Sequence, residues 1–263
     1  MSDSEKNKKY ESRNPDKKED FGYGYYPSRS PNNKPDDGDQ GKGWFKKLSE
    51  GKSIKNHLNC ASNVMQCIEH NRLVKILISA LKKNGCEYMI IFTSFSDFNP
   101  KRHVSCENCL SKVNGGYDPS NNQIVVCQNA STDQNVCCAV LTHELVHMFD
   151  YCRADVDFKN LEHLACTEIR AASFMHCRFF TAMSEGDASF FNYKNRHQEC
   201  VKRKAIMSVL MVRNITYDQA SAAVDRVFQR CYRDTEPFGR IPRMNSSDPE
   251  KILIEGYLYG YGS

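Results

Sequence analysis

The sequence predicts an α+β fold in which a small sheet is followed by helices. Two segments that are rich in β-branched and aromatic residues, 87–95 and 123–129, predict strands. No Gly or Pro interrupts residues 130–185, which favours long helices over this stretch. A chain of 263 residues has room for one or two domains and a sizeable core.

The remaining elements follow from local patterns. Apolar residues recur at helical spacing over 64–81, and Gly85 supplies a C-terminal stop. The stretch GGYDPSNN at 115–122 has strong turn chemistry between the two strands. Further helices are expected at about 134–150, 160–180, 197–212 and 216–232. The last of these begins with the capping-box pattern of Thr216 and Gln219.

The two ends of the chain differ from its middle. Residues 1–47 contain no Val, Ile, Leu, Ala or Cys, and such a segment cannot bury enough apolar surface to offset its ordering entropy. Residues 1–50 are therefore predicted to form a disordered polar tail. The GYGYY run at 22–26 is interpreted as a low-complexity tract rather than a docking site. A globular domain is expected at 54–242, followed by a C-terminal tail at 243–263.

The pattern His-Glu-Leu-Val-His at 143–147 carries the most information about chemistry. On a helix, residues four apart share a face and lie about 6 Å apart along the axis, so His143 and His147 can hold one metal ion. H-E-x-x-H is the pattern of a zinc hydrolase, in which zinc lowers the pKa of a bound water to about 7 and the carboxylate takes its proton. We expect Glu144 to be this base and Zn²⁺ to be the cofactor. The alternative is a buried amphipathic helix whose two His are merely hydrogen-bonded.

Zinc needs a third protein ligand and an open fourth position. In thermolysin-like enzymes this ligand is a Glu on the next helix, about twenty residues further on. Glu168 has this spacing from His147 and is the expected third ligand. The rivals are His163, Asp157 and Asp150. Asp150 is three residues past His147 and so lies on the same face of the helix. A carboxylate there could bind the metal, or it could instead hydrogen-bond to an imidazole ligand and orient it.

The strand at 123–129 comes directly before the motif helix. Zinc peptidases place an edge strand there, and it pairs with extended substrate. We therefore expect this strand to lie at the edge of the sheet, beside the site.

Composition and patterning exclude several classes of protein. The N-terminal segment lacks the apolar stretch that a secretory signal peptide needs. It also contains too many acidic residues for a transit peptide to the mitochondrial matrix. The sequence contains no run of eighteen apolar residues, which a transmembrane helix would need. The protein is therefore expected to be soluble or peripheral to a membrane. A net charge of +4 and a pI near 8.3 are too mild to predict nucleic-acid binding.

The chain has 13 cysteines, spread over the whole globular region. This distribution predicts disulfide staples, and an odd total leaves at least one thiol unpaired. Cys106 and Cys109 form the one C-x-x-C motif, and a structural zinc site there is the weaker alternative because no second pair has zinc-ribbon spacing.

Several longer motifs resemble one family. They are GGYD…IVVCQN (115–129), LTHELVHMFDYCR (141–153), LEHLACTEIRAA (161–172), QECVKRKAIMSV (198–209) and VFQRCYRDTEPF (227–238). In this order they are similar to the mitochondrial inner membrane metalloproteases that also act as ATP synthase assembly factors, over roughly residues 55–240. Residues 173–178 (SFMHCR) depart from the small, glycine-containing stretch that is usual after EIRAA.

The resemblance implies a zincin-like, disulfide-stapled zinc endopeptidase of the mitochondrial intermembrane space, peripheral to the inner membrane. Its protein substrate would be the precursor of the mitochondrially encoded a-subunit of ATP synthase. Carried over by position, His143 and His147 bind zinc and Glu144 is the catalytic base. The family also has an assembly role separable from proteolysis, so an assembly chaperone with a dispensable hydrolytic site is the alternative. A cysteine-stapled scaffold without metal is a third reading.

Overall fold

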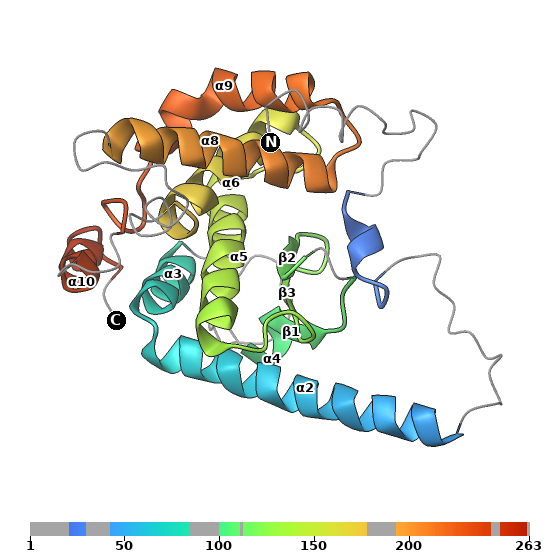
Figure 1. Cartoon of the computed structure of the whole chain (residues 1–263). Coiled ribbons are helices and arrows are strands. Elements are labelled where there is room, and N and C mark those ends of the chain that lie inside the picture. The colour runs from blue at the N-terminus through green and yellow to red at the C-terminus, as the bar shows by residue number, and fades with distance from the viewer. Residues whose placement is uncertain are drawn as a thin grey trace.

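The structure is a computed structural model that describes residues 21–29, 43–84, 100–110, 113–177, 193–242 and 248–261. Its strands are β1 (Val104–Glu107), β2 (Gly115–Asp118) and β3 (Gln123–Cys127). Its helical elements are η1 (Tyr23–Tyr25), α2 (Gly43–His70), α3 (Arg72–Lys83), α4 (Pro100–His103), α5 (Gln134–Ala154), α6 (Leu161–Met175), α8 (Tyr193–Val212), α9 (Tyr217–Arg233) and α10 (Asp248–Leu258). The prediction of an α+β fold with one small sheet is confirmed (Figure 1).

The described sheet has the order β1-β3-β2. β3 runs parallel to β1 and antiparallel to β2, with Val125 opposite Ser105 on one side and Gly116 on the other. The expectation that the strand before the motif helix is an edge strand is therefore wrong for the described sheet, because β3 is its central strand and the strand that hydrogen-bonds to Glu144 is β2. The strand predicted at 87–95 lies outside the described residues.

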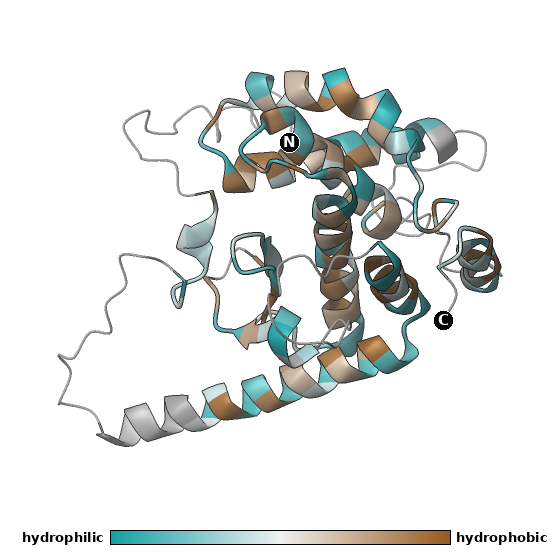
Figure 2. Ribbon diagram, turned by 180° about the vertical axis from the view of Figure 1, so that it is seen from behind, coloured by the Kyte–Doolittle hydropathy of each residue, from teal (hydrophilic) through white to brown (hydrophobic). Residues whose placement is uncertain are grey.

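Helix α5 runs through the centre of the molecule. It packs against α6, α2, α3, β2 and β3 (Figure 1). Its middle is buried on all sides, and Figure 2 shows it largely in hydrophobic colours, whereas the outer helices alternate. A helix whose middle is buried on all sides must be enclosed by other elements, and a short sheet and several helices surround it.

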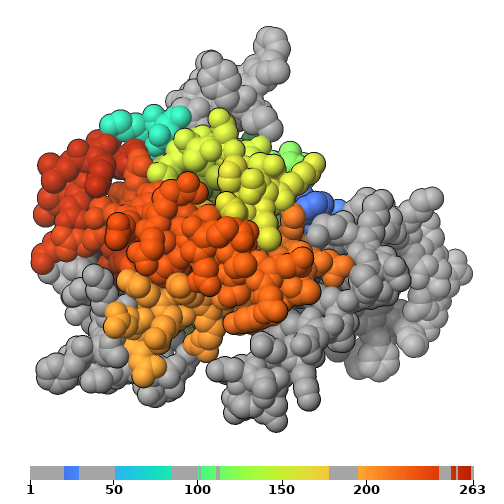
Figure 3. Space-filling view, turned by 90° about the horizontal axis from the view of Figure 1, so that it is seen from above, coloured from blue at the N-terminus to red at the C-terminus, as the bar shows by residue number. Residues whose placement is uncertain are grey.

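Two hydrophobic clusters lie on either side of the α5–α6 contact. The first joins α2, α3, α5 and the sheet, around side chains such as Leu77, Ile124 and Phe149. The second joins α6, α8 and α9, around Ile169, Leu210 and Phe228. In the view from above, α8 and α9 lie in the middle of the visible face, with α10 at one edge (Figure 3). The capping box predicted at the start of α9 is present.

The helical pattern over 64–81 belongs to two helices, not one. Asn71 ends α2 and caps α3, because its side chain accepts hydrogen bonds from the backbone N–H groups of Leu73 and Val74. An Asn that satisfies the first N–H groups of a helix favours a new start there. α3 ends at Lys83 with Asn84 as its C-cap, and the predicted stop at Gly85 lies outside the described residues.

The prediction of a disordered tail is wrong for two parts of residues 1–50. Residues 43–50 are helical and begin α2. Residues 21–29 lie against the sheet: the Tyr26 hydroxyl donates to the Gly115 carbonyl oxygen at 2.6 Å, and Arg29 Nη1 donates to Asp118 at 2.7 Å. The composition rule fails here because aromatic rings and an ion pair, rather than aliphatic side chains, hold the segment in place.

The C-terminal segment also belongs to the domain. α10 packs on α3, and Ile252 and Tyr261 are buried in the first cluster. Arg240 Nε donates to Glu255 at 2.8 Å and so ties α10 to the preceding loop. The boundary expected at residue 242 is therefore not an end of the fold.

Disulfide staples are confirmed. The pairs are Cys60–Cys106, Cys67–Cys138, Cys109–Cys127, Cys166–Cys231 and Cys177–Cys200. Cys152 is disulfide-bonded as well, and Cys137 is a buried free thiol. Because Cys106 and Cys109 bond to different partners, the C-x-x-C motif does not form a structural zinc site.

Candidate active site

Helix α5 places His143, Glu144 and His147 in the middle of the molecule. Asp133 starts the helix by accepting hydrogen bonds from the N–H groups of Asn135 and Val136. The helix then continues for 21 residues, and all three motif side chains are buried. The rigid, enclosed helix fixes their relative positions.

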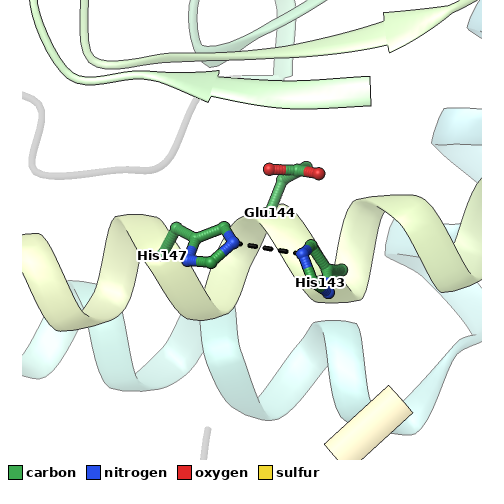
Figure 4. Close-up of side chains that lie close together, drawn as sticks. All are labelled: His143, Glu144 and His147. Atoms are coloured by element: carbon green, nitrogen blue, oxygen red, sulfur yellow. Dashed lines mark hydrogen bonds between the residues drawn. The ribbon is translucent and has the colours of Figure 1, made fainter. Parts of the chain in front are cut away.

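The two imidazoles converge on one point. His143 Nε2 and His147 Nε2 are 3.1 Å apart, and the two rings are nearly perpendicular (Figure 4). Glu144 lies on the side of α5 that faces the strands, where the backbone N–H of Tyr117 in β2 donates to its carboxylate. Ligand atoms of the three motif residues all lie within 4.8 Å of one another. This spacing is compatible with two nitrogen ligands and an adjacent base.

Glu168 on α6 completes the group. Its Oε2 lies 3.6 Å from His143 Nε2, and its Oε1 lies 3.6 Å from His147 Nε2. Oε2 is buried and has no hydrogen-bond partner among the residues that the structure describes. A buried carboxylate oxygen without a partner is costly unless it binds an ion, so this oxygen fits a metal ligand.

Burial sets the charge states of these groups. It lowers the pKa of His147 to about 4 and that of His143 well below its usual value, so both imidazoles are neutral at physiological pH. It raises the pKa of Glu168 to about 7, and burial together with the charge of Glu168 raises the pKa of Glu144 well above its usual value. Neutral imidazoles are the form that binds metals. A divalent cation between them would offset the energetic cost of burying the two negatively charged carboxylates.

His147 is oriented by a hydrogen-bonded chain behind it. Its Nδ1 lies 2.9 Å from Thr167 Oγ1, and the Thr167 hydroxyl donates to Asp150 Oδ2 at 2.9 Å. Arg170 Nε donates to both oxygens of Asp150, and Arg153 Nε donates to one. Because the Thr167 proton goes to Asp150, His147 Nδ1 is the donor and its Nε2 carries the free lone pair. Both oxygens of Asp150 thus accept hydrogen bonds from groups behind the His147 ring.

The other rivals for the third position lie elsewhere. His163 is at the start of α6, where its Nδ1 accepts from the backbone N–H of Asp157. Asp157 is exposed in the loop between α5 and α6. Among the described residues, the metal-ligand cluster around the motif imidazoles contains neither His163 nor Asp157.

Sequence reasoning missed His176. It follows α6, and its Nε2 lies 3.1 Å from His143 Nδ1. A signal was present, since this residue lies in the SFMHCR stretch that departs from the resembled family. Sequence spacing alone does not reveal the contact, because it depends on how the end of α6 packs against α5.

Comparison with known sequences decides the family. The sequence profile of the peptidase M76 family matches residues 58–239. The chain belongs to this family. The match spans the whole region from the second half of α2 to the loop after α9, including every residue of the site described above. The resemblance inferred from the motifs is confirmed.

Relatives of the chain in this family carry protease names. The mitochondrial inner membrane protease ATP23 homolog of Homo sapiens is 44% identical over 185 residues, which cover 70% of this chain and 70% of the relative. The Xenopus laevis homolog is 41% identical, with 85% and 87% covered. The mitochondrial inner membrane protease atp23 of Schizosaccharomyces pombe is 33% identical, with 71% and 95% covered. No solved structure matches the chain.

Proposed function

We propose that this peptidase is a zinc-dependent endopeptidase, with His143, His147 and Glu168 as metal ligands and Glu144 as catalytic base. The observation that carries the proposal is the buried Oε2 of Glu168, which has no hydrogen-bond partner within the described part of the chain and lies 3.6 Å from His143 Nε2. Two neutral imidazoles and one carboxylate are the donor set of a catalytic zinc site, with a fourth position left for solvent. A zinc ion supplies Lewis acidity, which makes water acidic near neutral pH and polarises a carbonyl.

The chain's own residues supply the proton transfers. Glu144 accepts a proton from the attacking water and later passes it to the leaving amine. The Tyr117 N–H keeps its carboxylate facing β2, beside the two imidazoles. The Thr167–Asp150 chain and Arg170 hold His147 in the tautomer that leaves Nε2 unprotonated.

For location and substrate we propose the mitochondrial intermembrane space and the precursor of the a-subunit of ATP synthase. The names of the relatives support a mitochondrial inner membrane protease, and the motif resemblance supports this substrate. In the part of the chain that the structure describes, no helix has the length and apolar character to span a bilayer. We therefore propose that the protein contacts the inner membrane at its surface.

The test is Glu144→Gln in the full chain, assayed for cleavage of the a-subunit precursor and for zinc content. The amide keeps the shape of the side chain but cannot take a proton, so cleavage should fall by about 10²–10⁴-fold while one zinc per chain is retained. Glu162→Gln is the matched control, because Glu162 is an exposed acid on α6. Full turnover by Glu144→Gln contradicts the assignment of the base.

The same variant separates the enzyme from an assembly chaperone. Cells in which the Glu144→Gln variant replaces the wild-type protein should fail to process the precursor. If this variant nevertheless restores ATP synthase assembly, chaperoning is the essential role and proteolysis is dispensable.

A further inference from the structure

His176 contacts the nitrogen of His143 that faces away from His147. His176 Nε2 lies 3.1 Å from His143 Nδ1, and the two ring centroids are 4.8 Å apart. His143 Nε2 faces His147 Nε2 on the other side of the ring. The ring of His143 is therefore held between two imidazoles, one at each nitrogen.

A neutral imidazole carries one proton, and the partner of one nitrogen decides which nitrogen keeps it. If His143 is to give its Nε2 lone pair to a metal ion, its Nδ1 must carry the proton. That N–H then needs an acceptor, and the unprotonated Nε2 of His176 is at the right distance. Burial keeps His143 neutral, so this choice of tautomer applies at physiological pH.

We propose that His176 is a positioning residue, which accepts the His143 Nδ1–H and thereby fixes the tautomer and ring orientation that metal binding requires. The inference rests on the proposed metal site. It assigns to His143 the kind of support that Thr167 and Asp150 give to His147.

The position of His176 is defined by the fold, although its side chain is exposed. Its backbone N–H donates to the Ala172 carbonyl oxygen at 3.0 Å and so closes the last turn of α6. The next residue, Cys177, is bonded to Cys200 of α8. The disulfide and the helix end thus hold the ring against His143, and replacing an exposed ring leaves no cavity in the core.

The test compares three full-length variants, prepared without metal and titrated with zinc against a chromophoric chelator. His176→Leu removes the acceptor, and zinc affinity should fall by about 10–100-fold. His176→Gln retains an acceptor oxygen and should recover most of the affinity. His70→Leu, at the exposed end of α2, is the control and should bind as the wild type does.

A spectroscopic measurement distinguishes positioning from general damage to the fold. Cobalt(II) placed in the site reports ligand geometry through its visible absorption bands. The spectrum of His176→Leu should change, that of His176→Gln should stay close to wild type, and the thermal unfolding of the metal-free variants should be unaltered.

The outcomes separate this inference from the proposed function. Wild-type zinc affinity and an unchanged cobalt spectrum in His176→Leu overturn the positioning role alone. Equal losses in His176→Leu and His176→Gln overturn the hydrogen-bond explanation. If the wild-type protein itself binds no zinc, the proposed function fails and the inference fails with it.

Discussion

Burial lowers the pKa of the two imidazoles of the site and raises the pKa of its carboxyl groups. The imidazoles become neutral, as ligands must be, but Glu168 with a pKa of about 7 is partly protonated at neutral pH. A carboxylic acid must lose its proton before it can bind a cation. If Glu168 is a metal ligand, as we propose, metal binding is therefore coupled to the release of a proton from this residue.

This coupling gives zinc affinity a defined pH dependence. Below pH 7 Glu168 holds a proton that zinc must displace, so the apparent affinity should fall by up to about tenfold per pH unit between pH 7 and pH 5. His147, with a pKa of about 4, adds no competing proton in this range. Chelator competition at several pH values measures the slope. Glu168→Gln should bind zinc more weakly and lose the slope, and an undiminished slope in that variant contradicts the assignment.

Cys137 illustrates burial at a residue outside the site. Its thiol is fully buried, and burial raises its pKa to about 11. Since the thiolate is the reactive form, iodoacetamide should label Cys137 only after unfolding. Peptide mapping by mass spectrometry checks this, and rapid labelling of the native protein would show that the α5 helix opens readily.

At the scale of elements, features set by local sequence patterns were predictable, whereas features set by long-range packing were not. The α5 and α6 helices and the capping box of α9 follow from local sequence patterns, and Glu168 is identified by its spacing from His147 on the next helix. The break at Asn71 is hidden, because the apolar pattern continues across it. The central place of β3 and the approach of His176 to His143 depend on how elements pack, and no short pattern encodes them.

The segment at 21–29 is the clearest case of a missed element. Arg29 is largely buried between Glu107 and Asp118, and these ion pairs and hydrogen bonds lower the pKa of both acids although burial opposes the shift. A composition rule averages over the tail and does not detect one well-placed guanidinium. The segment covers the sheet and contributes Tyr26 to a small cluster around Val125.

Arg29→Ala should therefore destabilise the protein measurably. We expect a loss of about 2–3 kcal/mol in the free energy of unfolding by urea, because buried charged hydrogen bonds are removed while both acids keep other donors. Arg226→Ala is the control: its ion pair with Glu162 is exposed and should contribute less than about 1 kcal/mol. Equal effects of the two variants would mean that the segment does not pack on the sheet in solution.

At the scale of the whole molecule, disulfides tie each hydrophobic cluster together. Cys60–Cys106 and Cys67–Cys138 join α2 to the sheet and to α5, and Cys166–Cys231 joins α6 to α9. Cysteine spacing predicted staples but not their pairing, because pairing depends on the packing of helices that are distant in sequence. The candidate site lies where the two clusters meet, so we expect both clusters to be needed to keep the α5 and α6 site residues in register.

Removing one staple should loosen one half of the molecule. The double variant Cys166→Ser and Cys231→Ser frees a loop of 65 residues, and about 4 kcal/mol of stability should be lost. Hydrogen exchange should increase first in α8 and α9, while α2, α3 and the sheet stay protected. Uniform loss of protection throughout the chain would show that the two clusters unfold as a single unit.

One diffraction experiment tests the metal site most directly. Crystals of the full chain grown with zinc, and measured on both sides of the zinc absorption edge, should show one strong anomalous peak. We expect it about 2.0–2.2 Å from His143 Nε2, His147 Nε2 and a carboxylate oxygen of Glu168. A peak bound by other residues, or no peak between the two imidazoles at saturating zinc, would contradict the proposed hydrolase.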